Sequence, residues 1–397
     1  MSTTIQNLAQ RQVMLSFAYL AYTGENFTTP EQENTMLGLI QTAMPQIPPL
    51  AASPWKIVWY AAPYTVPGAL YQDNFMFVAQ NIADPSQYAV AIRGTNFVSN
   101  LNWFMEDFDV LQMMPWPLGN TTIPAPAEMV SESTSIGMNV LLSMLGSTPG
   151  SSAAPTNLHD FLLGQTQNGG QPTKINVCVT GHSLGGMLAG TMALYLSDNQ
   201  SSWDASNQST ISCITFAAPT AGNQAFAAYS DQAFNGKTSP PNWDTTLGSN
   251  CDAVRCDLDV APLFSTASNI SQSVDGNPYS PLFAVYGANI DFEKLTFKQK
   301  DEWGAVNGSI LPMLASILTT RGYTQIVSGA AQVQGTFKPL DSFDPPIDIT
   351  SSFHNSFTNY LKAFGAEAGW QHSNSYPTIL QVPALLSSGI IVRSVAQ

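Results

Sequence analysis

Apolar residues along the chain fall into short strand-like runs that alternate with longer segments of helical character. Residues 175–180 (INVCVT) are typical of a buried strand, and residues 184–196 have the apolar content and length of a helix. The alternation continues on both sides of this pair, which predicts an α/β fold whose mostly parallel central sheet is flanked by helices on both faces. The other predicted strands are 56–62, 75–80, 88–95, 213–219 and 253–262, and the other predicted helices are 12–24, 28–44, 128–145 and 222–234.

Polar segments rich in Gly, Ser, Pro and Asn separate these elements, and they predict surface loops over about 146–173, 199–210 and 236–250. Residues 263–352 lack a clear period and predict a cap or insertion within a single domain that spans 1–397. No run of 18 or more apolar residues predicts a helix that crosses a bilayer. The N-terminal segment matches a secretory signal poorly, which leaves a cytoplasmic location and secretion by a signal-less route both open.

The hexapeptide GHSLGG, residues 181–186, lies at the junction of the predicted strand and the predicted helix. A G-x-S-x-G pattern in that setting predicts a sharp turn that forces Ser183 into a strained backbone conformation and presents its hydroxyl. The first backbone N–H groups of the helix, from Leu184 onward, have no acceptor within the helix and face any oxyanion beside Ser183. The alternative is a Gly-rich connection without chemistry. Small residues that would let helix and strand approach closely are Gly181, Gly185, Gly186, Ala189 and Gly190.

A nucleophilic serine needs a base within hydrogen-bonding reach, and the chain has 4 histidines. His182 directly precedes Ser183 on the same tight turn, and its side chain is expected to project away from the Ser183 hydroxyl. We therefore interpret it as an orienting or packing residue. In α/β-hydrolases the histidine follows the serine in the chain, which excludes His159. His354 and His372 remain as candidates for the base.

Net charge and cysteine content narrow the function further. The chain has 13 Lys and Arg against 27 Asp and Glu, so its net charge of −14 disfavours nucleic acids and anionic membranes and favours a neutral substrate. Cys178 and Cys213 lie in apolar runs and are expected to be buried thiols, whereas a local disulfide between Cys251 and Cys256 stays open. No ligand spacing accompanies these cysteines, so a zinc site is not expected.

Several motifs in order over about residues 88–262, AVAIRGTN, GHSLGG, TFAAPTAGNQAF and DVAP, together resemble those of the class 3, or fungal-type, triacylglycerol lipases of the α/β-hydrolase fold. LSFAYLAYTG is also similar to that family's N-terminal helix, and QHSNSY to its terminal histidine region. The resemblance implies Ser183 as nucleophile, Asp259 as acid and His372 as base, with Asp257 and Asp252 as competitors of Asp259. It implies an oxyanion hole formed by Thr95 and Leu184, and it requires no cofactor and no metal.

This chain departs from the family pattern in two ways: the segment from Asp259 to His372 is longer than in compact members, and Ala261 stands where valine is usual. In the family, a lid follows the strand that ends in Arg-Gly-Thr, which corresponds to about residues 96–120 here. Met and aromatic side chains there suit a neutral ester or lipid substrate at an oil–water interface, although they could equally pack into the core. A short-chain or feruloyl-type carboxylesterase and a non-catalytic binding protein remain as alternatives, and the oligomeric state stays open. The side chains in question are Trp103, Phe104, Met105, Met113, Met114 and Trp116.

Overall fold

The computed structural model describes residues 8–25, 27, 30–64, 74–94, 112–116, 127–167, 170–234, 251–256, 331–333, 342 and 369–387. Only short pieces of the expected lid (96–120) and of the expected insertion (263–352) belong to these residues. Thr95, Asp257, Asp259 and His354 lie outside them. The single-domain organisation over 1–397 therefore stays a prediction.

An 8-stranded mixed sheet forms the centre of the fold, in the order β10-β9-β8-β7-β3-β2-β1-β6. Pairing is parallel from β3 through β10, as predicted, but β1, β2, β3 and β6 pair antiparallel. Only residues 82–86 join β2 to β3, which is too short for the crossover that parallel strands need. The strands are β1 (Trp55–Ala61), β2 (Met76–Asn81), β3 (Gln87–Ile92), β6 (Gly146–Ser147), β7 (Asn176–His182), β8 (Thr210–Phe216), β9 (Cys251–Cys256) and β10 (Ala331–Val333).

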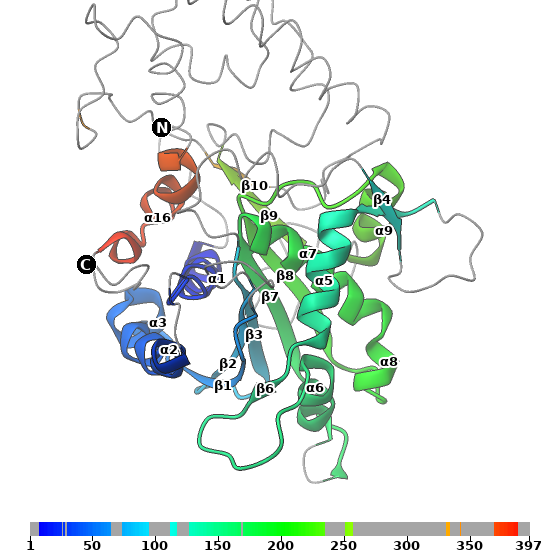
Figure 1. Ribbon diagram of the computed structural model, residues 1–397, viewed down its shortest axis with the longest axis horizontal. Coiled ribbons are helices and arrows are strands. Elements are labelled where there is room, and N and C mark those ends of the chain that lie inside the picture. The colour runs from blue at the N-terminus through cyan, green and yellow to red at the C-terminus, as the bar shows by residue number, and fades with distance from the viewer. Residues whose placement is uncertain are drawn as a thin grey trace, which may run out of the picture.

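Helices cover both faces of the sheet, as the sequence predicts (Figure 1). One face carries α1 (Leu8–Leu20), α2 (Pro30–Ala43), η1 (Met44–Gln46), α3 (Pro48–Ala52), α16 (Ser375–Ile379) and η8 (Pro383–Leu386). The other face carries α5 (Glu132–Ser143), α6 (Leu158–Thr166), α7 (Leu184–Asp198), α8 (Gln200–Trp203) and α9 (Gln224–Phe234). A small separate hairpin pairs β4 (Met113–Pro115) with β5 (Met129–Ser131). Among the described residues, no helix is both long enough and apolar enough to cross a membrane.

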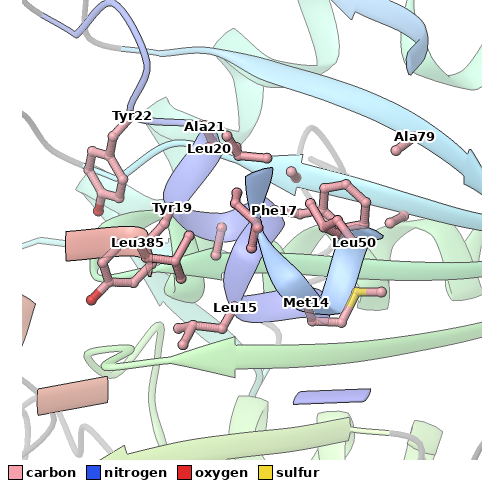
Figure 2. Packing of buried hydrophobic residues seen from close by; sticks show 14 of the residues in the cluster. Met14, Leu15, Phe17, Tyr19, Leu20, Ala21, Tyr22, Leu50, Ala79 and Leu385 are labelled. Atoms are coloured by element: carbon pink, nitrogen blue, oxygen red, sulfur yellow. The ribbon is translucent and has the colours of Figure 1, made fainter. Parts of the chain in front are cut away.

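Helix α1 is enclosed rather than laid on the surface. Every residue from Met14 to Tyr22 is buried, so the C-terminal half of α1 is enclosed on all sides and is not exposed on one face as an amphipathic surface helix would be. It lies between the sheet, α3 and the C-terminal segment (Figure 2). The Gln12 side-chain amide donates a 2.9 Å hydrogen bond to the Leu380 carbonyl, which ties the two ends of the described chain together.

Two of the predicted loops contain helices. Helix α6 lies within 146–173, and α8 lies within 199–210, so the prediction of continuous loops is wrong at both places. Helix α6 begins after Asn157, whose side-chain oxygen accepts a 2.8 Å hydrogen bond from the Asp160 backbone N–H. This N-cap, with an acidic residue in the first turn, was the available signal for a helix in an otherwise polar segment.

The cysteines differ from the expectation. Cys178 is a buried thiol, but Cys213 is disulfide-bonded, which corrects the prediction of two buried thiols. The side chains of Cys251 and Cys256 lie outside the described residues, so the local Cys251–Cys256 bridge stays a prediction. The strand register aligns the Cα atoms of Cys213 and Cys251, a proximity between strands that sequence spacing does not reveal.

Asp204 organises the turn between α8 and β8. Its carboxylate, on a residue only 1 % exposed, accepts hydrogen bonds from the Ser206 backbone N–H and hydroxyl (3.2 and 2.6 Å) and from the Ser209 N–H (2.7 Å). Burial raises the pKa of Asp204, but these hydrogen bonds outweigh burial and hold its pKa below the ordinary value. Ionised Asp204 therefore stabilises the fold above about pH 4, and this contribution is lost as the pH falls through its pKa in the folded state.

We expect Asp204→Asn to lower the free energy of unfolding by about 1–3 kcal/mol at pH 7, because the amide group would face donors with donors of its own. The loss should shrink at pH 3, below the ordinary pKa of aspartic acid, because the carboxyl group of the unfolded chain is then largely protonated and ionised Asp204 contributes less stability. Urea unfolding at the two pH values measures both. The control is Asp160→Asn, whose side chain is 55 % exposed. Equal destabilisation at both pH values would contradict the role assigned to the charge.

Candidate active site

Ser183 occupies a strained turn between β7 and α7, as the GHSLGG motif predicts. Its backbone angles are φ 59° and ψ −132°, a region that residues other than glycine rarely adopt. The Ser183 backbone N–H donates a 3.0 Å hydrogen bond to the Phe216 carbonyl at the end of β8, which fixes the turn against the sheet. The turn therefore places Ser183 at the N-terminus of α7.

Glycines around this turn allow backbone to meet backbone. A Cβ atom on Gly181 would lie 2.2 Å from the Gly185 carbonyl oxygen, and one on Gly186 would lie 2.9 Å from the Phe216 oxygen. A Cβ atom on Gly185 would lie 2.4 Å from the Ile92 oxygen, so these three positions require glycine as predicted. A Cβ atom on Gly190 would meet nothing within 4 Å, so the prediction that Gly190 permits a close approach is wrong.

The end of β3 lies against the first turn of α7, on the side where an oxyanion would form. A Cβ atom on Gly94 would lie 3.2 Å from the Gly185 backbone nitrogen. Leu184 is the first residue of α7, so its backbone N–H belongs to the helix end that lacks intrahelical acceptors. Thr95, the other predicted donor, follows Gly94 directly in the sequence but lies outside the described residues.

His372 is brought to the same turn from the other end of the chain. It is 4 % exposed, and the centroid of its ring lies 4.6 Å from that of His182, the residue before Ser183. The His372 backbone carbonyl also lies 2.7 Å from His182 Nε2. The structure therefore places His372, the predicted base, beside the segment that carries the predicted nucleophile.

His182 is engaged through both ring nitrogens. Nε2 contacts the His372 carbonyl, and Nδ1 lies 3.0 Å from the Tyr22 hydroxyl. Its ring also packs against Tyr19 and Tyr376, at centroid distances of 5.1 and 5.8 Å. These contacts agree with an orienting or packing residue. Sequence reasoning missed Tyr19 and Tyr22, and their three-residue spacing at the end of the predicted helix was the available signal.

Arg93 is a second residue near the site to which sequence reasoning gave no role. Its guanidinium donates from Nε to the Ala21 carbonyl and from Nη2 to the Thr23 carbonyl, both at 2.7 Å. The guanidinium carbon lies 4.9 Å from the centroid of the Phe75 ring. Arg93 thereby holds the turn after α1, residues 21–25, against the end of β3.

The remaining candidates divide by position. Asp252 lies within β9, across from Ile214 of β8, and not beyond the end of the strand as a catalytic acid would. His159 lies on α6 with Nε2 2.8 Å from the Ser202 hydroxyl, apart from the Ser183 turn, in agreement with its exclusion. Asp259, Asp257 and His354 lie outside the described residues, so the acid stays a prediction.

Part of the expected lid region belongs to the core. Trp116 is 2 % exposed, packs edge-on against Phe226 at 5.4 Å between ring centroids, and donates from Nε1 to Asp198 Oδ2 at 3.1 Å. Asp198 also accepts a 2.8 Å hydrogen bond from Tyr229, and burial together with this carboxylate raises the pKa of Tyr229 to about 12. Trp116 is therefore not a side chain that meets an acyl group. Trp103, Phe104 and Met105 lie outside the described residues.

Comparisons with known proteins agree with this architecture. The family model for class 3 lipases matches residues 89–239, which include most of the β3 strand and GHSLGG. M37 lipase is similar with a TM-score of 0.68 and 26% identity, covering 96% of this chain and 97% of that chain. Lipase from Rhizopus microsporus var. chinensis covers 66% of this chain and 70% of that chain, at 19% identity and a TM-score of 0.41. The native Rhizomucor miehei lipase propeptide complex covers 66% and 64%, at 18% identity and a TM-score of 0.39.

No curated protein matches the chain. The likeness to M37 lipase runs along nearly the whole length of both chains and confirms the α/β-hydrolase fold expected from the sequence. The matched family model contains the strained serine turn and the strand whose end lies against it. With a serine hydrolase motif in its expected structural setting and a lipase fold around it, the chain is similar to the class 3 lipases, whose family model matches residues 89–239.

Proposed function

We propose that the protein is a lipase that hydrolyses the carboxylic esters of acylglycerols through Ser183, His372 and Asp259. The observation that carries the proposal is the strained Ser183 turn at the N-terminus of α7, with buried His372 docked beside the neighbouring residue. The match of residues 89–239 to the class 3 lipase family model and the likeness to M37 lipase support the same class of reaction.

The topology supports the two members that lie outside the described residues. Strands β3, β7, β8 and β9 are parallel, so their carboxyl ends meet at one edge of the sheet, where ligands bind in open α/β sheets. Ser183 follows β7 directly, Thr95 follows the end of β3 in the sequence, and Asp259 follows the end of β9. In this proposal Asp259 orients His372, and the Thr95 and Leu184 backbone N–H groups stabilise the oxyanion.

The reaction then proceeds as an acyl transfer in two steps. Ser183 Oγ attacks the ester carbonyl carbon while its proton passes to His372, and the carbonyl oxygen becomes an oxyanion. Collapse of this intermediate breaks the bond to the alcohol, which leaves with the proton from His372. A water molecule then gives its proton to His372 and attacks the acyl-enzyme, after which the acid leaves and Ser183 recovers its proton.

A fluorescent organophosphonate ester combined with a series of acyl esters tests the proposal. We expect covalent labelling of the peptide that contains Ser183, a rate that rises from acetyl and butyryl to octanoyl esters, and a further gain on triacylglycerol emulsions. Rates confined to acetyl and butyryl esters, with no gain on emulsions, would make the protein a carboxylesterase. Absence of labelling and of all ester hydrolysis would favour a non-catalytic binding protein with a hydrolase fold.

A further inference from the structure

We propose that His182 is a positioning residue that holds His372 in its reactive place, and that it is itself fixed by Tyr22 from the turn after α1. The inference rests on the proposed function, because it assigns His182 and Tyr22 to the support of the proposed base. It starts from an unusual arrangement: a histidine next to the nucleophile whose hydrogen bonds lead to the backbone of another histidine 190 residues away.

The hydrogen-bonding roles of His182 follow from its partners. Nε2 lies 2.7 Å from the His372 carbonyl oxygen, which can only accept, so Nε2 carries a proton and donates. In the neutral ring Nδ1 is then an acceptor, and the Tyr22 hydroxyl, 3.0 Å away, is the group that donates to it. His182 and Tyr22 are 1 % and 0 % exposed, so water does not compete for these bonds.

A second tyrosine holds the next carbonyl along the same segment. The Tyr19 hydroxyl donates a 2.6 Å hydrogen bond to the Ser373 carbonyl, and the Tyr19 ring lies 5.1 Å from that of His182. Figure 2 shows Tyr19 and Tyr22 projecting to the same side of the α1 region. His182 and Tyr19 therefore grip two consecutive carbonyls, those of His372 and Ser373.

Tyr22 is in turn held by rigid neighbours. Its hydroxyl also donates to the His182 carbonyl at 3.1 Å, so its one proton is shared between two acceptors of the same residue. A Cβ atom on Gly94 would come within 2.3 Å of this hydroxyl, so the end of β3 closes over it. The residues on either side of Tyr22, Ala21 and Thr23, are the two whose carbonyls bind Arg93. The hydrogen bonds thus run from the end of β3 through the α1 turn and His182 to the segment that carries His372.

Such an arrangement acts on the rate rather than on substrate binding. His182 does not touch the reacting atoms in this proposal; it sets where the backbone of His372 lies, and so where the His372 ring meets Ser183. A misplacement of about 1 Å in a catalytic group can cost about 100-fold in rate. Loss of the Nε2 donor should therefore lower kcat while leaving KM nearly unchanged.

A matched pair of variants, His182→Gln and His182→Asn, separates positioning from packing. The glutamine amide nitrogen reaches about as far as Nε2 and can still donate to the His372 carbonyl, whereas the shorter asparagine amide cannot. We expect His182→Asn to lower kcat by about 100-fold with KM within about threefold of wild type, and His182→Gln to remain within about tenfold. Tyr22→Phe should lower kcat by about tenfold, and His159→Asn, a surface histidine, should leave it unchanged.

Equal loss of kcat in the Gln and Asn variants, or a loss that tracks the melting temperature, would overturn the positioning role. So would a wild-type rate in His182→Asn. A readout independent of activity is the long-range ¹H–¹⁵N spectrum of the 4 histidines in ¹⁵N-histidine-labelled protein, in which His182 should show the Nε2–H tautomer. A wild-type protein that hydrolyses no ester and does not react with the organophosphonate, but still shows this tautomer, would refute the proposed function. The hydrogen-bond arrangement would then remain intact.

Discussion

Ser183→Ala is expected to lower kcat for ester hydrolysis by about 10⁴-fold or more, because the substitution removes the only atom proposed to form the acyl-enzyme. Alanine and serine have the same backbone preferences at φ 59°, so the strain of the turn is retained and the fold should not suffer. Initial rates on octanoyl esters and the loss of organophosphonate labelling measure the effect. Thermal melting should show no decrease.

The control for this variant is Ser143→Ala, at the exposed end of α5, which should keep the wild-type rate. A Ser183→Ala protein that is folded and retains more than about a hundredth of the wild-type rate would show that Ser183 is not the nucleophile. In that case the strained turn would need another explanation, since strain of this kind costs about 1–3 kcal/mol.

Gly185→Ala is expected to be among the most disruptive single-methyl changes in the described part of the protein. The new Cβ atom would lie 2.4 Å from the Ile92 oxygen, 2.6 Å from the Arg93 carbonyl carbon and 2.7 Å from the Gly94 nitrogen. All three are backbone atoms, so no flexible side chain can move aside. Helix α7 must retreat from β3, and we expect a loss of about 3 kcal/mol in the free energy of unfolding.

The same displacement moves the first N–H groups of α7 away from β3, so activity should fall by at least about 100-fold in the protein that remains folded. Gly190→Ala, on the same helix, is the matched control. A Cβ atom there meets nothing within 4 Å, so the substitution should raise the free energy of unfolding by about 0.5–1 kcal/mol through helix propensity alone. Denaturant unfolding of the two variants should therefore give opposite signs, and equal signs would contradict the contacts described for Gly185.

Local signals in the sequence identified the parts of the fold that local physics determines. The apolar run before GHSLGG and the helical run after it predict β7, the turn and α7, because side-chain periodicity and the missing Cβ atoms act within a few residues. His372 was chosen as the base because QHSNSY resembles the terminal histidine region of the family. The position of His372 beside His182 agrees with that choice. The roles of Asp259 and Thr95 stay predictions.

Features that depend on distant parts of the chain were not accessible in the same way. The bonding of Cys213 in a disulfide is one such feature, because the spacing of cysteines in a sequence does not reveal which of them meet in the folded sheet. The hydroxyl groups of Tyr19 in α1 and Tyr22 in the turn after it have partners 354 and 160 residues away, and the three-residue spacing of the two tyrosines does not identify those partners. Helix α6 was missed for a different reason, since its capping residue sits in a segment dominated by Gly, Ser and Pro.

The docking of the C-terminal segment on α1 has a consequence for biosynthesis. A nascent chain that has emerged through β9 already carries the serine elbow, but hydrolysis as proposed here also needs the ring of His372, which lies more than a hundred residues downstream of that strand. Closing so long a loop adds little to the thermodynamic cost, because that cost grows only with the logarithm of loop length, yet it postpones the contact. The chain is thus expected to hydrolyse esters only late in folding, after its C-terminal segment has packed against α1.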